Sequence, residues 1–181
     1  MGQILISKPN KDDLKSAFEV FKITIKDAFE KDGIGHLKDE LLKEIEYKKQ
    51  LLTDSVENPN SNFFFLFAKI HDQVVGTISF GPCGTDIKTC TNHELDAIGE
   101  LGSLYVLPEY QGKGIGSALI QSMVIQLHKR GIEQFCLDSG YKHAQKKWIK
   151  KFGKPYKIVN DYWGENSVHM VWLCDVKDFI N

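Results

Sequence analysis

Apolar side chains recur along this chain with two different spacings, which predict alternating helices and strands. Apolar positions three or four residues apart predict an amphipathic helix from Leu14 to Phe29 and a second helix from Leu37 to Leu52. Gly33 and Gly35 end the first helix, and Asn58-Pro59-Asn60 forms a turn after the second. The same spacing predicts two later helices, at residues 115–127 and 146–152.

Short apolar runs predict the strands between these helices. Two consecutive runs with a tight turn near Asp72 predict a β-hairpin. A later strand, which Pro108 ends, is followed by a helix and another strand, and this order predicts a parallel pair joined by a right-handed crossover. The predicted strands are 3–7, 63–70, 74–80, 98–106, 134–138, 156–159 and 168–173, which together indicate an α/β fold with a mixed sheet.

The segment from Gly81 to Ala97 shows little periodicity and is rich in Gly, Pro, Asp, Thr and Asn. A loop of this length inside a compact domain is usually functional or mobile. Its other interpretation is a plain surface insertion, and the sequence leaves both open.

Composition narrows the class of protein. The 181 residues are 42% apolar and 26% charged, which excludes a collagen-like, disordered or membrane-embedded chain and predicts one domain over residues 1–181. The formal net charge of −1 gives no whole-chain attraction to nucleic acid or to anionic lipid. The longest apolar run, Phe63 to Ala68, is far shorter than the roughly 20 residues of a membrane span. We therefore expect a cytoplasmic protein with no nucleic-acid or membrane partner.

The four cysteines do not predict a metal site. None forms a C-x-x-C pair, and a zinc site would need Cys83, Cys90 and His93 together with an unidentified fourth ligand. Cys136 and Cys174 lie in apolar runs and are expected to be small core residues. His169 and His143 are likewise expected to have core or capping roles.

The segment with the clearest chemistry is the turn Gln111-Gly112-Lys113-Gly114-Ile115-Gly116, which joins the strand before Pro108 to a helix. A helix N-terminus exposes unpaired backbone N–H groups that bind anions, and glycines let a phosphate approach the backbone closely. Lys113 adds a cation. A P-loop is excluded because no Gly-x-x-x-x-Gly-Lys-Ser/Thr string occurs, and the dinucleotide fingerprint fails because its third glycine would fall on Ser117.

This turn resembles the acetyl-CoA signature Arg/Gln-x-x-Gly-x-Gly/Ala of the GNAT superfamily of N-acetyltransferases. The resemblance implies a GNAT-like fold, with a mixed, mostly antiparallel twisted sheet, a central parallel splayed strand pair and helices on both faces. It also implies acetyl-CoA as cosubstrate and no metal. The acyl group would lie where the strand at 98–106 and the strand at 134–138 splay apart. The implied cofactor-binding residues are Leu104, Tyr105 and Val106 along pantetheine, Gln111, Gly112, Lys113, Gly114, Ile115, Gly116 and Ser117 around the pyrophosphate, and Ser139 after the second strand.

An amine acceptor arrives protonated, because a lysine-like amine has a pKa near 10.4, so the reaction needs a base. Glu100, on the strand leading into the turn, is the predicted base, and the strand period puts it on the face of Leu104 and Val106. The alternative is that Glu100 is only a salt-bridge partner. The predicted transfer is direct, with the Val106 N–H stabilising the thioester oxygen, rather than through an acyl group on Cys136.

The general acid is less clearly indicated. Many relatives carry a helix Tyr that protonates the leaving thiolate, but Trp148 or Ile149 occupies that place here. Tyr141 and Tyr156 are the nearby catalytic candidates, and each has an alternative role as a packing or surface tyrosine.

The expected acceptor is a primary amine of a small molecule or polyamine. Glu94 and Asp96 would attract its positive charge, and Trp163 lies in the loop before the last strand, where a substrate could contact it. Two alternatives stay open, which are acetylation of a protein amine and a non-catalytic acyl-CoA-binding module. The sequence also leaves open whether the chain is a monomer or a homodimer.

Overall fold

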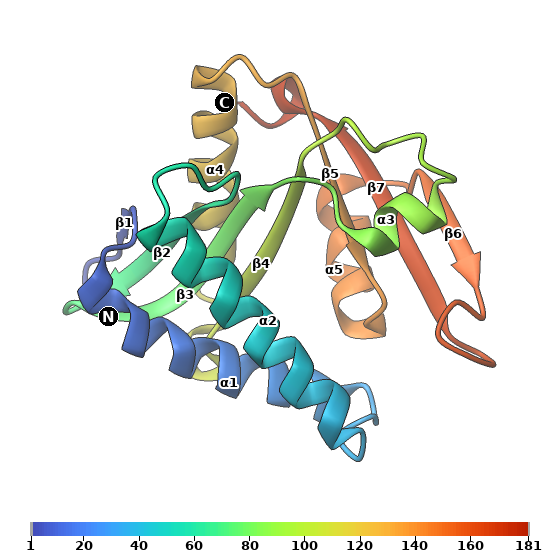
Figure 1. The fold of residues 1–181 in the computed structure, drawn as a ribbon, viewed down its shortest axis with the longest axis horizontal. Helices are drawn as coiled ribbons and strands as arrows, with labels where there is room; N and C mark the ends of the chain where they lie inside the picture. Colours follow the sequence, from blue (N-terminus) through green and yellow to red (C-terminus); the bar gives the residue numbers. More distant parts are fainter. Residues whose placement is uncertain (1, 181) are drawn as a thin grey trace.

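A seven-stranded sheet in the order β1-β2-β3-β4-β5-β7-β6 forms the centre of the computed structural model, which describes residues 2–180 (Figure 1). Every neighbouring pair is antiparallel except β4 and β5, which are parallel. The predicted mixed sheet with one central parallel pair is therefore confirmed. The strands are β1 (Leu5–Ser7), β2 (Phe64–Ile70), β3 (Gln73–Gly81), β4 (Glu100–Val106), β5 (Gln134–Ser139), β6 (Lys157–Asn160) and β7 (Val168–Asp175).

Helices cover both faces of the sheet, as predicted (Figure 1). Two long helices lie over β2, β3 and β4 on one face, and the crossover helix between β4 and β5 covers the other face. The α-helices are α1 (Leu14–Lys31), α2 (Lys38–Glu57), α3 (Thr85–Cys90), α4 (Ile115–Lys129) and α5 (Lys142–Phe152), and the short 3₁₀ turns are Lys11–Asp13, Pro108–Tyr110 and Val176–Phe179.

The segment from Gly81 to Ala97 is not an irregular loop. It contains α3, which packs on β5, β6 and β7, and it contributes to a second, smaller core. The sequence pattern missed this helix because it is short and because one of its two buried residues is Cys90, which acts here as a small apolar residue. The buried members of this second core are Cys83, Ile87, Cys90, Leu95, Cys136 and Val171.

An extra residue in β4 changes which way its side chains point. Ser79 pairs with Gly102 and Thr77 pairs with Tyr105, so β4 carries one more residue than β3 over this stretch, and Ser103 has a positive φ of 48°. A β-bulge of this kind shifts the alternation by one position. The Tyr105 ring consequently meets α1, with its centroid 5.7 Å from that of Phe21.

The expected common face of Glu100 and Val106 is therefore wrong. Val106 faces α4, where its Cγ2 atom lies 3.9 Å from the position of a Cβ on Gly116. The Glu100 carboxylate lies on the other face, where it accepts a hydrogen bond from the N–H of Gly84.

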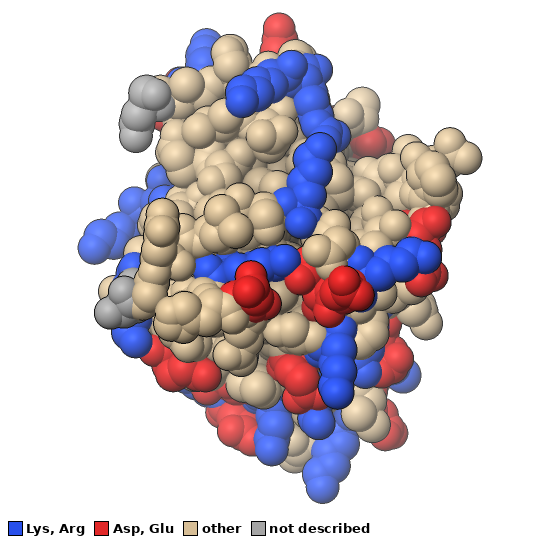
Figure 2. Space-filling model, turned by 90° about the vertical axis from the view of Figure 1, so that its left-hand side faces the viewer, with Lys and Arg blue, Asp and Glu red and all other residues tan. Residues whose placement is uncertain are grey.

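On the face shown in Figure 2, acidic and basic side chains lie next to one another across the middle and lower part, whereas the upper part carries mainly basic and uncharged side chains. Within residues 2–180, no helix combines the length and the apolar character needed to span a membrane.

We expect Ile87→Ala to lower the free energy of unfolding by about 2–5 kcal/mol, because Ile87 is fully buried and anchors α3 to the sheet. Ile23→Ala, at a position that is 43% exposed on α1, is the matched control and should change the stability by less than about 0.5 kcal/mol. Urea unfolding of both variants measures the difference. Equal midpoints would show that α3 is not held by this contact.

Candidate active site

Strands β4 and β5 separate soon after they meet. Their ladder consists of the pair Glu100 and Cys136, next to a hydrogen bond from the Cys136 N–H to the Gly99 oxygen (2.9 Å). Beyond this point β4 continues for six residues beside β3 alone. The predicted splayed pair is thus present, and it opens a gap between the end of β4 and the end of β5.

The backbone of Val106 points into this gap. Groups on an antiparallel strand face alternate sides, and Leu107 N–H donates to the Val75 oxygen on β3 (2.9 Å), so the N–H and C=O of Val106 face away from β3. The Val106 oxygen accepts a hydrogen bond from the Gln111 side chain (3.0 Å). Gln111 therefore fixes the turn against the end of the strand, and the Val106 N–H remains directed toward β5.

The glycine turn adopts the backbone conformation that its sequence suggests. Gly112 and Gly114 have φ values of 73° and 83°, a left-handed region that favours glycine, and a Cβ on either residue would meet no atom within 4 Å. The turn is therefore open to its surroundings. The first N–H with a partner inside α4 is that of Ala118, which donates to the Gly114 oxygen, so the three preceding N–H groups, of Ile115, Gly116 and Ser117, point out of the helix end.

Two lysines lie near this helix end, in different ways. Lys113 folds back, and its ammonium donates to the Glu109 oxygen (2.7 Å) and lies over the Tyr110 ring. Lys151 of α5, which the sequence did not indicate, reaches across to the Ser117 hydroxyl (3.5 Å). The turn, the helix end and these cations suit the pyrophosphate and phosphates of coenzyme A, so the chain's residues fit the implied cosubstrate.

Glu100 lies at the base of the gap between β4 and β5. Its Oε2 atom accepts a hydrogen bond from the Gly84 N–H (2.7 Å), just before α3. Burial raises the pKa of Glu100 to about 7, with a further increase from the negative charge of Asp138, while Lys48 of α2 and the Gly84 N–H act in the opposite direction. A carboxyl group with a pKa near 7 is suited to act as a general base at neutral pH.

The carboxylates whose charges act on Glu100 are not those that the sequence suggested. Asp138 on β5 and Asp86 on α3 both raise its pKa. Glu94 instead accepts a hydrogen bond from the Tyr156 hydroxyl (2.6 Å), and Asp96 pairs with His93 (2.9 Å) on an exposed part of the segment after α3. Glu94 and Asp96 stay predicted contacts of the acceptor, but in this structure their carboxylates pair with Tyr156 and His93.

The opposite wall, on the α2 side of Glu100, also carries polar groups that the sequence did not single out. Lys48 is mostly buried and pairs with Glu44 (3.7 Å), and the Tyr105 hydroxyl donates to Glu44 (3.4 Å). Burial and the Glu44 charge raise the pKa of Tyr105 well above its usual value. The contact between Tyr105 and Glu44 joins residues 61 positions apart, which no local spacing could reveal.

The two predicted tyrosines differ in position. Tyr141 directly precedes α5, its ring packs against Phe29, and burial raises its pKa well above 10. Tyr156 is 45% exposed and lies next to β6, two strands beyond β5 in the sheet. Trp148, which with Ile149 is one of two positions where the resemblance would place a Tyr, packs on Phe152 with ring centroids 5.6 Å apart.

Ser139, Trp163 and Cys136 complete the predicted set. The Ser139 hydroxyl accepts a hydrogen bond from the Tyr141 N–H (3.0 Å) and so shapes the end of β5. The Trp163 indole N–H donates to the buried His169. Cys136 is fully buried and burial raises its pKa, so it is an inert core thiol, as expected. Residues 2–180 contain no cluster of three or more metal-ligating side chains.

Comparison with known proteins gives one family. The family model for the acetyltransferase (GNAT) family matches residues 20–153. A search of curated protein sequences gave no significant match.

Among solved structures, a protein of the GNAT family from Desulfovibrio desulfuricans aligns with a TM-score of 0.72 at 14% identity, over 96% of this chain and 99% of that chain. The PaiA N-acetyltransferase of Thermoplasma acidophilum, solved with coenzyme A, aligns with a TM-score of 0.67 at 20% identity, over 94% and 98% of the two chains. The ribosomal-protein-S18-alanine N-acetyltransferase of Escherichia coli aligns with a TM-score of 0.63 at 14% identity, over 96% and 94%. These likenesses show the shared fold.

We expect Gly116→Val to weaken coenzyme A binding at least 10-fold while leaving the melting temperature nearly unchanged. A Cβ at Gly116 has room inside the protein, since its nearest neighbour is the Val106 side chain at 3.9 Å, so the added methyl groups would obstruct the phosphate rather than the fold. Gly114→Val is a less clean test, because its positive φ would strain any other residue. Calorimetric titration with coenzyme A measures the effect.

Ile125→Val, further along the same helix and 37% exposed, is the control and should bind coenzyme A like the unchanged protein. Normal affinity in Gly116→Val would mean that the phosphates bind elsewhere.

Proposed function

Because the chain belongs to the GNAT acetyltransferase family, we propose that it is an acetyl-CoA-dependent N-acetyltransferase that acts on a primary amine of a small molecule or polyamine. The observation that carries this proposal is the position of Glu100. A partly buried carboxyl group with a pKa of about 7 lies at the base of the strand gap, on the same strand that leads to the glycine turn. A base and a phosphate site are thereby joined by one rigid strand.

Acetyl-CoA supplies an acetyl group that is activated as a thioester. Glu100 accepts a proton from the acceptor ammonium, which frees the electron pair of the nitrogen. The Val106 N–H donates a hydrogen bond to the carbonyl oxygen while the nitrogen attacks the carbonyl carbon. The C–N bond forms, the C–S bond breaks, and the second proton of the nitrogen passes to solvent.

Tyr141 is the proposed acid for the leaving sulfur. Its raised pKa keeps the hydroxyl protonated at neutral pH, and it lies two residues after the end of β5, at the start of α5. Tyr156 is a weaker candidate, because it is exposed at the edge of the sheet and its hydroxyl already donates to Glu94.

The charges near Glu100 favour a cationic acceptor. Asp138 and Asp86 contribute negative charge beside it, against the single positive charge of Lys48. An alkylammonium would be attracted to this site, whereas an anionic acceptor would be repelled. A protein amine is the alternative acceptor, and an acceptor screen scored by release of free thiol separates the two classes.

We expect Glu100→Gln to lower kcat by about 100-fold or more, with little change in the KM for acetyl-CoA. The unchanged protein should gain activity as the pH rises through about 7, where Glu100 becomes ionised. Glu100→Gln should lose that step and recover part of its rate at high pH, where more of the amine is neutral. Steady-state rates between pH 5.5 and 9.5 measure both effects.

Stability gives an independent check on Glu100. A carboxyl group whose folded-state pKa is raised from 4.5 to about 7 favours folding below pH 4.5 and loses that contribution as the pH rises toward 7. The free energy of unfolding of Glu100→Gln should therefore fall less over this range. An identical pH–rate profile in both proteins would remove Glu100 from the mechanism, and tight coenzyme A binding without thiol release from any amine would support a non-catalytic module instead.

We expect Tyr141→Phe to lower kcat by about 10-fold to 100-fold while keeping both KM values, because the ring still packs on Phe29 and only the proton donor is lost. Tyr156→Phe is the matched control and should retain its rate. A larger loss in Tyr156→Phe than in Tyr141→Phe would reverse the assignment.

A further inference from the structure

A chain of hydrogen bonds runs from the protein surface to a carboxylate beside Glu100. The Trp163 indole N–H, in the turn between β6 and β7, donates to Nδ1 of His169 on β7 (3.0 Å). The other ring nitrogen of His169, Nε2, lies 2.9 Å from Oδ2 of Asp138 on β5. The His169 side chain is only 4% exposed, and that of Asp138 is 22% exposed.

The chemistry of these groups fixes the position of the protons. An indole N–H can only donate, so Nδ1 of His169 must accept and carries no proton. A neutral imidazole then has its one proton on Nε2, which donates to the Asp138 carboxylate. A proton on Nδ1 would face the Trp163 N–H, so this arrangement fits the ring form whose proton is on Nε2 and is directed at the Asp138 carboxylate.

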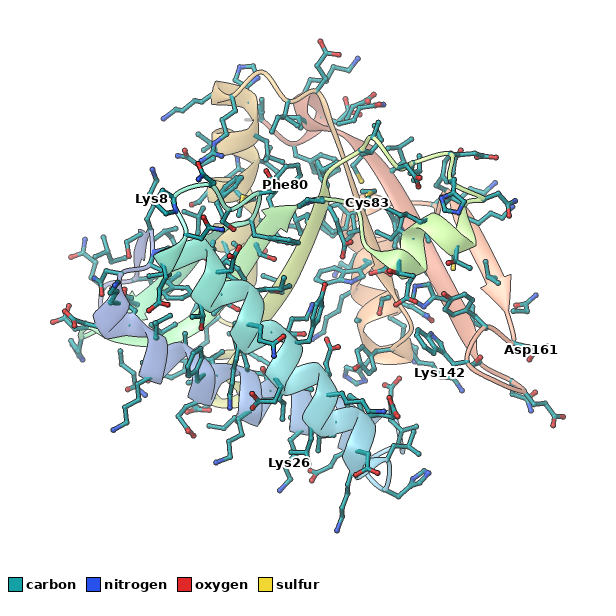
Figure 3. The ribbon with its side chains drawn as sticks, viewed as in Figure 1. Lys8, Lys26, Phe80, Cys83, Lys142 and Asp161 are labelled. Atoms are coloured by element: carbon teal, nitrogen blue, oxygen red, sulfur yellow. The ribbon has the colours of Figure 1, made fainter. Side chains whose placement is uncertain are left out.

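The orientation of Trp163 is built into the surrounding residues. Trp163 is 59% exposed, yet its ring packs edge-on against that of Tyr162, with centroids 4.8 Å apart. A Cβ on Gly140 would lie 2.9 Å from the indole nitrogen and 3.2 Å from Nδ1 of His169, so only glycine permits this close approach. The Tyr162 hydroxyl in turn donates to Asp86 of α3 (2.9 Å). In Figure 3, three labelled residues mark the segments around these contacts: Cys83 before α3, Lys142 at the start of α5 and Asp161 in the β6–β7 turn.

The location of Asp138 connects this chain with the proposed base. Glu100 pairs with Cys136, and Asp138 lies two residues further along β5, on the same face as Cys136. That face is the one covered by α3, where the Gly84 N–H binds Glu100. Among residues 2–180, the Asp138 carboxylate has one hydrogen-bond partner, the His169 ring at Oδ2, so Oδ1 is left for a ligand.

We infer that Asp138 binds the ammonium group of the acceptor, and that His169 and Trp163 are positioning residues that fix the orientation of this carboxylate. The inference rests on the proposed function. It assigns separate tasks to two neighbouring carboxyl groups, since Asp138 holds the charged amine and Glu100 removes its proton. The signature around the glycine turn contains neither Asp138 nor its two supporting residues.

Spermidine is the probe for ammonium binding. We expect it to bind the unchanged protein, with chemical-shift changes at Asp138, and to bind Asp138→Asn at least 10-fold more weakly. The asparagine oxygen can still accept from His169, so this substitution removes the charge and keeps the geometry. Asp175→Asn is the matched control, because Asp175 accepts a side-chain hydrogen bond from Gln134 at the other end of the β5–β7 pair.

The ¹⁵N chemical shifts of the His169 ring test the positioning role of His169 and Trp163 separately. At pH 7.5, the ¹⁵N shifts of His169 should show a proton on Nε2 alone in the unchanged protein. Trp163→Phe keeps an aromatic ring but removes the indole donor, so His169 should populate the form with a proton on Nδ1, and spermidine should bind more weakly. A structural role alone would leave the shifts of the folded variant unchanged.

Two results would overturn the inference: equal spermidine affinity in Asp138→Asn and the unchanged protein, or no spermidine binding to the unchanged protein. A proton on Nδ1 of His169 in the unchanged protein would overturn the positioning role. These measurements need no turnover, so a failure of the proposed acetyl transfer would appear separately, as absence of thiol release while spermidine binding still depends on Asp138.

Discussion

The arrangement of the site depends on one constraint, which is that β4 and β5 pair at Glu100 and Cys136 and then diverge. A strand inside a sheet normally has partners on both sides, but the end of β4 has a partner only on the β3 side. The Val106 oxygen is satisfied by the Gln111 side chain, which also holds the glycine turn in place. The gap and the Val106 backbone groups that face it are thus consequences of the same divergence, and Gln111 ties the glycine turn to them.

The divergence also explains how a carboxyl group is tolerated in this part of the fold. A buried charge is costly unless it is paired or neutralised, and Glu100 receives one backbone hydrogen bond and a partly opposing charge from Lys48. Its pKa therefore rises to about 7 instead of falling. The fold thereby keeps a group that is poorly suited to stability but well suited to proton transfer, and α3 and α2 supply the surroundings that set this balance.

Sequence patterns alone predicted most of the architecture, because helices and strands here have regular apolar faces. The helix at the N-terminus, the hairpin around Asp72 and the parallel pair all follow from local spacing and element order. His71 and Asp72, for example, have positive φ values in a two-residue turn, which the sequence indicated as a tight turn. The glycine turn could be identified too, because its chemistry lies in six consecutive residues.

The tertiary structure alone decided the parts that depend on distant residues or on one irregular residue. Because of the bulge at Ser103, the side chains of Glu100 and Val106 lie on opposite faces of the sheet. Simple strand alternation in the sequence cannot indicate an inserted residue. Asp138, Asp86, Lys48 and His169 come from four different elements, so their proximity results from sheet order and helix packing, not from spacing. The sequence by itself therefore determined the order of the elements and the glycine turn proposed to bind phosphate, whereas the charges around Glu100, the proposed base, were set by long-range packing.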